Sequence, residues 1–220
     1  MTVDIAASAQ GLSCRAMHAS DGRCAIKAKQ ADKLPPIVRG HDIFNLVAIG
    51  ILNLLNLSFL SGLLSGQPLV LASLAYFLVD MVYVGLFPRC IKSPMVILGH
   101  HLISVALVLI PHQYPQYAWC LAYCMLVEVN TWLLIAKRTI KYGAQLMEVL
   151  FYVTWVLTRN VWYPWLVWVF YQEWRAASAA AGTPWNPILI TPLFQACLTA
   201  LNFHWTWALL RKGRAHGKQL

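Results

Sequence analysis

Charged residues are scarce in this chain. Asp, Glu, Lys and Arg make up only 11% of its 220 residues, and just 8 of them are acidic, whereas 59% of the residues are hydrophobic. Soluble globular domains carry about 25% charged residues. The shortage of charge therefore excludes an ordinary soluble domain and predicts an integral membrane protein.

Cysteine pairing motifs are also missing. None of the 6 cysteines belongs to a Cys-x-x-Cys pair, and Cys120, Cys124 and Cys197 lie in apolar stretches, which argues against a disulfide framework and against a zinc site. The net charge of +9 does not indicate a nucleic-acid partner, because most basic residues lie in short segments between apolar stretches and no basic-aromatic motif occurs. We expect neither a bound metal nor nucleic acid.

What the chain does have is a series of long apolar segments. Each is near the roughly 20 residues that a bilayer requires, and Gly, Pro and small polar clusters separate them. They predict an all-α polytopic bundle of about six transmembrane helices, over Phe44–Gly66, Pro68–Pro88, Met95–Pro111, Tyr117–Ala136, Glu148–Tyr171 and Pro187–Leu210. The predicted organisation is a polar, disordered tail over 1–40, a transmembrane domain over 41–210 and a basic tail over 211–220.

The basic residues predict how the bundle is oriented. If the six segments alternate in direction, fifteen of the 17 lysines and arginines fall on one side, Arg175 falls on the other, and Arg159 lies inside a segment. Short loops that face the cytosol are enriched in Lys and Arg. Both termini are therefore expected in the cytosol.

Ionisable residues inside the apolar segments are the strongest functional signal. His100 and His101 lie in the third segment, Asp80 in the second, Glu128 in the fourth and Arg159 in the fifth. Because such groups are costly in hydrocarbon, they are expected to converge on an internal cavity that opens toward the cytosol. Neighbouring helical residues point about 100° apart. One histidine should therefore face the cavity as an acid or base, and the other should bond to a neighbouring helix.

Structural roles for these groups stay open. Arg159 can simply neutralise Asp80 or Glu128, and an intramembrane histidine can serve only as a hydrogen-bonding link between helices. Two histidines with two carboxylates could bind a metal, but the spaced histidine motifs of lipid hydroxylases are absent.

The order of these residues resembles the TLC-domain family, which includes the ceramide synthases. The resemblance covers about residues 70–210 and rests on four elements: Tyr76-Phe-Leu-Val-Asp80-Met-Val-Tyr83, the pair His100-His101, the run Glu128-Val-Asn130-Thr131, and Arg159 five residues before Pro164. It implies a protein of lipid metabolism in the endoplasmic reticulum, and a 1–40 tail that is a remnant of upstream family elements. It also implies catalytic roles for His100, His101, Asp80 and Glu128, and substrate contacts from Arg159, Asn130, Tyr76 and Tyr83.

The resemblance leads to two functional hypotheses. The first is acyl transfer from acyl-CoA to a lipid amine or hydroxyl, with acyl-CoA as co-substrate and no resident cofactor. Ceramide synthases carry a His-Asp-x-x-Asp run where this chain has Val127-Glu128-Val-Asn130-Thr131, so the chain is closer to the other TLC domain-containing proteins. The second hypothesis is a non-enzymatic lipid sensor, regulator of membrane composition or cargo receptor. A transporter is less well supported, because the sequence shows neither repeats nor paired helix breaks. Self-association into a homo-oligomer stays open.

Overall fold

The fold is helical throughout the residues that the computed structural model describes, which are 36–91, 93–140 and 142–217. No strand occurs in these ranges. The predicted all-α class is therefore confirmed. Most of the predicted N-terminal tail, up to residue 35, lies outside the described residues.

Nine α- and π-helical elements follow one another along the described chain. They are α3 (Pro36–Leu60), α4 (Gly66–Leu86), α5 (Pro94–Gln113), α6 (Ala118–Met125), α7 (Val127–Thr139), α8 (Ala144–Thr154), the π-helix η3 (Trp155–Trp162), α9 (Tyr163–Ala181) and α10 (Ile190–Gly217). Short 3-10 turns precede α5, α6 and α10, and each begins with a proline: Pro88–Cys90, Pro115–Tyr117 and Pro187–Leu189.

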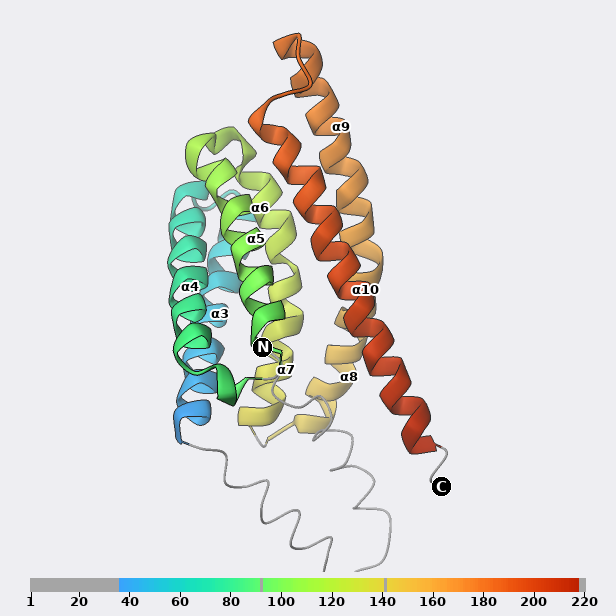
Figure 1. The fold of residues 1–220 in the computed structure, drawn as a ribbon. Coiled ribbons are helices and arrows are strands. Elements are labelled where there is room, and N and C mark those ends of the chain that lie inside the picture. Colours follow the sequence, from blue (N-terminus) through green and yellow to red (C-terminus); the bar gives the residue numbers. More distant parts are fainter. Residues whose placement is uncertain (1–35, 92, 141, 218–220) are drawn as a thin grey trace, which may run out of the picture.

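These elements form antiparallel helical passes (Figure 1). Because α6 continues into α7, and α8 continues through η3 into α9, the described chain makes six passes. The blue start of α3 and the red end of α10 lie at the same end of the bundle (Figure 1). This arrangement is compatible with both termini on one side of a membrane. That this side is the cytosol stays a prediction.

The helices are suited to a bilayer. Four of them, α3, α4, α5 and the helix over Pro187–Arg211, are long and apolar enough to cross a membrane. The pair α6 and α7 makes a fifth span if its two parts, bent by 41°, count as one. The remaining predicted span, Glu148–Tyr171, falls inside the unbroken helical stretch from Ala144 to Ala181. The polytopic bundle is thus confirmed, and the predicted count of about six is approximate.

The first span begins earlier than its hydropathy suggests. It was expected over Phe44–Gly66, but α3 runs from Pro36 to Leu60, so it includes the last residues of the predicted tail. Proline is tolerated in the first helical turn. At the other end, Gly62 adopts φ +75°, a conformation that stops the helix and favours glycine. The earlier start brings His41 into the span, where it is buried one turn before Asn45.

Polar and apolar residues are distributed in the reverse of a soluble protein. The interior holds 16 buried polar or charged side chains among the described residues, whereas long apolar side chains such as Leu54, Leu57 and Val82 point outward. In lipid the outward apolar side chains need no further burial, and the polar ones must find partners inside. The surface of the bundle is therefore a lipid-facing surface.

Two passes deviate from regular α-helix near the centre of the bundle. The chain bends between α6 and α7, and side chains from other helices donate to the three consecutive carbonyls before the bend: Asn56 to Ala122, Trp162 to Tyr123 and Tyr163 to Cys124. The facing pass contains η3, a π-helical segment of 8 residues. Such segments are frequent at functional sites. The two irregular stretches carry Glu128 and Arg159 into the interior.

Candidate functional site

The best-defined part of the site is a carboxylate held between two histidines from different helices. Asp80 on α4 accepts a hydrogen bond from Nε2 of His41 on α3, with the atoms 2.5 Å apart. Its other oxygen, Oδ2, lies 3.2 Å from Nδ1 of His101 on α5. That second contact is within ion-pair distance but lacks hydrogen-bond geometry. All three side chains are buried, and they join three helices at one point.

Tyr83 supports this cluster instead of lining an open site. Its ring stacks on the ring of His41, with the centroids 3.8 Å apart and the planes within 4° of each other. Its hydroxyl donates to the carbonyl of Ile37 in the first turn of α3. Tyr76, one turn before Asp80, is buried in the apolar core and packs against Phe77. Both tyrosines, predicted as substrate contacts, therefore lie against protein in this structure.

The adjacent histidines point in different directions. His101 faces Asp80, whereas His100 faces a cavity on the other side of α5. Their ring centroids are 5.3 Å apart, so the two imidazoles remain electrostatic neighbours. His100 also meets Trp205 of α10 edge-on, at 5.8 Å between centroids. The Nδ1 atom of His100 is buried without a hydrogen-bond partner in the described part of the chain.

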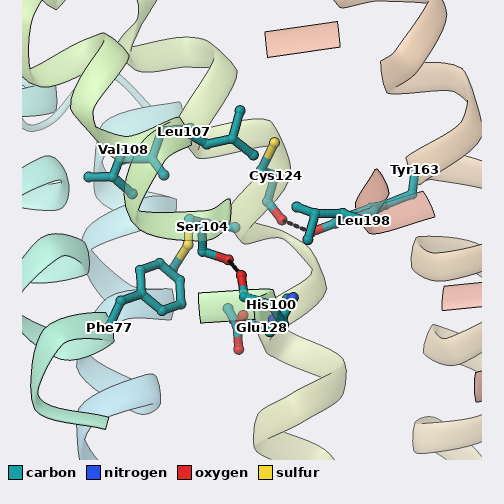
Figure 2. A pocket seen from close by; sticks show the side chains of 11 residues that line it. Phe77, His100, Ser104, Leu107, Val108, Cys124, Glu128, Tyr163 and Leu198 are labelled. Atoms are coloured by element: carbon teal, nitrogen blue, oxygen red, sulfur yellow. Dashed lines mark hydrogen bonds between the residues drawn. The ribbon is translucent and has the colours of Figure 1, made fainter. Parts of the chain in front are cut away.

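The cavity beside His100 is small, at about 30 Å³. A water molecule needs at least about 10–15 Å³, so there is room for water but not for a lipid chain. Figure 2 shows His100 and Glu128 together at one end of the cavity, Leu107 and Val108 toward the other, and Leu198 at its side. Ser104 closes the wall beside His100, and its hydroxyl donates to the His100 carbonyl. The cavity therefore has one polar end and a long apolar lining.

Arg159 is the centre of a second polar cluster. Its guanidinium donates three hydrogen bonds to neutral side chains, to Asn130 at 2.9 Å, Asn202 at 2.7 Å and Thr131 at 3.3 Å. The charge also lies 4.7 Å from the ring centre of Trp155 and 5.7 Å from that of Trp205. Cation–π contacts of this kind are favourable, the more so when water is excluded. These hydrogen bonds and ring contacts together stabilise the buried guanidinium group.

Most of the predicted site residues belong to one of two polar clusters. Asp80, His101 and Tyr83 form one cluster, and Arg159, Asn130 and Thr131 form the other. Glu128 is buried and lines the cavity, one helical turn before Thr131. Trp205 contacts both His100 and Arg159 and so links the cavity-facing histidine to the second cluster. The amide nitrogen of Asn130 donates to the Phe151 carbonyl and to the Thr154 hydroxyl, and its amide oxygen accepts from Arg159. Its observed role is to orient Arg159.

Sequence reasoning missed two of these groups, His41 and Asn202. His41 was assigned to the region before the first span, although Asn45 one turn later and the buried positions Ile49 and Leu52 continue the same helical face. Asn202 follows Gln195 at a spacing of seven residues on α10, and both are buried. Helical spacing of polar residues was the available signal in both cases.

A metal centre is not formed by the side chains that the structure describes. No group of three or more His, Cys, Asp or Glu residues in those ranges is arranged to hold an ion.

The helical fold, with its apolar surface and buried polar layer, defines an integral membrane protein with a candidate site inside the bundle. Within that class, a family model described as the TLC domain matches residues 61–211, which is more than half of the chain. The chain belongs to the TLC-domain family and is a membrane lipid-related protein. Neither the curated proteins nor the solved structures contain a match to it. Helix α3 lies before the matched region.

Proposed function

We propose that this protein transfers an acyl group from acyl-CoA to the amine or hydroxyl of a membrane lipid. The observation that carries the proposal is His100, which lines an internal cavity with an unpartnered, buried Nδ1 and with Glu128 at the same end. A base needs a free ring nitrogen within reach of a substrate proton. His100 has such a nitrogen and lines the cavity, whereas His101 does not line it and its Nδ1 lies 3.2 Å from Asp80.

In the proposed reaction His100 acts as general base and then as general acid. It accepts the proton of the acceptor amine or hydroxyl while the nitrogen or oxygen attacks the thioester carbonyl. The carbon–sulfur bond breaks as the amide or ester bond forms. The proton on His100 then passes to the departing thiolate, so the imidazole ends as it began. Glu128 stabilises the imidazolium that exists between the two transfers, because an opposite charge nearby favours the protonated form.

Arg159 is the proposed binding group for the anionic part of a substrate. A guanidinium has five N–H donors, and three hydrogen bonds to side chains are formed here. The remaining donors suit a phosphate or carboxylate, which Arg binds in a bidentate manner. Asn130 and Thr131 hold the guanidinium in place for this contact.

Substrate entry requires the lining helices to separate. Ligand pockets usually enclose about 300–1,000 Å³, far more than the present cavity of about 30 Å³. The lining comes from both halves of the bundle, with Leu107 on α5 facing Leu198 on α10. The acyl chain is therefore proposed to enter from the bilayer between such apolar walls. We place this activity in the endoplasmic reticulum, with the polar end of the cavity toward the cytosol.

A non-enzymatic role as lipid sensor, regulator of lipid composition or cargo receptor is the second candidate. It is favoured by the small size of the cavity and by the polar groups that satisfy one another, such as Arg159 with Asn130. In that case the polar layer only holds the helices together, and a lipid binds elsewhere on the bundle.

Direct assay separates the two candidates. The purified full-length chain in lipid nanodiscs is incubated with radiolabelled long-chain acyl-CoA and a panel of sphingoid amines, lysophospholipids and diacylglycerol. Formation of an acylated product that depends on His100 supports the enzyme. Absence of any product across the panel, together with saturable lipid binding, favours the sensor or receptor.

A further inference from the structure

His41, the partner that α3 supplies to Asp80, lies outside the region that the TLC family model matches. That region starts at residue 61, whereas His41 lies in the second turn of the preceding helix. Yet its Nε2 makes the closest contact of the Asp80 carboxylate, at 2.5 Å, across 39 residues of chain. The carboxylate that faces the paired histidines is therefore completed by a residue from outside the matched domain.

The two contacts of Asp80 are unequal. His41 is hydrogen-bonded to Oδ1, whereas His101 lies 3.2 Å from Oδ2 without hydrogen-bond geometry. Hydrogen bonds between charged groups are shorter than neutral ones. A buried carboxylate needs an opposite charge nearby to remain ionised. The geometry therefore favours His41 over His101 as the cationic partner.

The surroundings of His41 also favour a cation there. The face of Tyr83 stacks on its ring at 3.8 Å, and a positive charge over an aromatic face is stabilised. Asn45 does not contribute to this preference, because its amide nitrogen, a hydrogen-bond donor, lies 3.0 Å from the same Nε2. Asp42, the next residue in the chain, forms an ion pair with Arg138 of α7 at 2.9 Å. From α5 the only titratable group of the cluster is His101.

We infer that His41 is a positioning residue that holds the proton balancing Asp80, and thereby keeps His101 neutral. The consequence reaches His100, whose ring is 5.3 Å from that of His101. A positive charge on His101 would oppose protonation of its neighbour, because like charges disfavour the charged form. His41 thus acts through Asp80 and His101 on the cavity-facing histidine. This last link rests on the proposed base function of His100, whereas the protonation pattern itself does not.

The protonation pattern can be measured without any activity. The full-length protein is labelled with ¹⁵N-histidine, reconstituted in nanodiscs at neutral pH and studied by solid-state NMR, with each histidine assigned by its His→Gln variant. The expected spectrum has His41 as imidazolium and His101 as neutral imidazole. A neutral His41 in the unmodified protein overturns the inference.

Variants at the same position sharpen the test. His41→Gln keeps a side-chain donor but removes the charge, so the His101 signal is expected to move to the imidazolium position. His41→Lys restores a positive charge and is expected to return His101 to the neutral position. His204→Gln, an exposed histidine on α10, is the matched control and leaves His101 unchanged. A His101 signal that stays neutral in His41→Gln contradicts the inference.

A second variant keeps the test decisive if His41→Gln does not fold. Asp80→Asn removes the carboxylate, so His41 is expected to lose its imidazolium signal, and persistence of that signal overturns the proposal. If acyl transfer is detected, His41→Gln should lose turnover at neutral pH and regain it at higher pH, where His101 loses its proton. A protein without turnover that shows the expected NMR pattern refutes the proposed function alone.

Discussion

Nε2 of His41 lies 2.5 Å from Oδ1 of Asp80 and joins the first described helix to the matched domain. The same helix is held by four further polar contacts: Tyr83 to the Ile37 carbonyl, Arg138 to Asp42, Trp132 to the Leu46 carbonyl and Asn56 to the Ala122 carbonyl. In a bilayer, where helices gain little from apolar contact with one another, such hydrogen bonds and close packing hold a bundle together. Helix α3 is thus a full member of the bundle that forms the site.

Close packing between α4 and α6 gives the first prediction. A Cβ added at Gly66 would lie 2.5 Å from Cβ of Ala118 and 3.2 Å from the ring of Phe59. Gly66→Ala is therefore expected to lower the free energy of unfolding by about 1–3 kcal/mol, the usual cost of overpacking. Thermal unfolding in detergent, followed by tryptophan fluorescence, measures the change.

Gly85→Ala is the matched control for this variant. Gly85 lies in the same helix, and an added Cβ there meets nothing within 4 Å. Relief of glycine's helix penalty should leave stability unchanged or raise it by up to about 1 kcal/mol. Equal destabilisation by both substitutions would show that α4 and α6 do not approach as described.

The cluster around Arg159 gives a second prediction. Because Nε of Arg159 donates to Asn130 at 2.9 Å, a double-mutant cycle of Arg159→Lys and Asn130→Ala should show a favourable coupling energy. Measured couplings between hydrogen-bonding residues in membrane bundles average about 0.6 kcal/mol and reach about 1.7 kcal/mol. Lysine lacks the planar fork that meets three partners at once, so the single substitution already destabilises. Strictly additive effects would mean that the two side chains do not interact.

Topology gives a third prediction, which the charge distribution motivates. Tags at the N- and C-terminus should both be digested when protease is added outside sealed microsomes, since fifteen of 17 basic residues are expected on the cytosolic side. A tag in the loop between α9 and α10 should be protected until detergent is added. Protection of either terminal tag from the protease would contradict the predicted topology.

The sequence was sufficient for the fold class, and it singled out the ionisable residues of the candidate site. Asp80, His100, His101, Glu128 and Arg159 stand out because ionisable groups in apolar segments are costly and need partners. The sequence could not say which partners meet, because that depends on how each helix is rotated about its axis. Arg159, for example, was expected beside a carboxylate, but it donates to neutral side chains.

Two other features were beyond sequence reasoning for physical reasons. The bend at Leu126 has no proline or glycine to mark it, and donors from distant residues, Asn56, Trp162 and Tyr163, satisfy the carbonyls there. His41 was overlooked because polar residues at the start of α3 lower its local hydropathy. In a bundle whose interior is polar, such residues belong to the span and not to the tail.

The direct test of the central claim compares three histidine variants in acyl transfer. His100→Ala should reduce kcat by about 10²–10⁴-fold, the usual contribution of a positioned base, while stability stays near that of the unmodified protein. His101→Ala removes a partner of Asp80 and should lower thermal stability more than His100→Ala does. His112→Ala, at the exposed far end of the same helix, should change neither. Full turnover by His100→Ala would contradict the assignment of His100 as the base, and restoration of lipid composition in knockout cells by a His100→Ala, His101→Ala protein would contradict the enzyme itself.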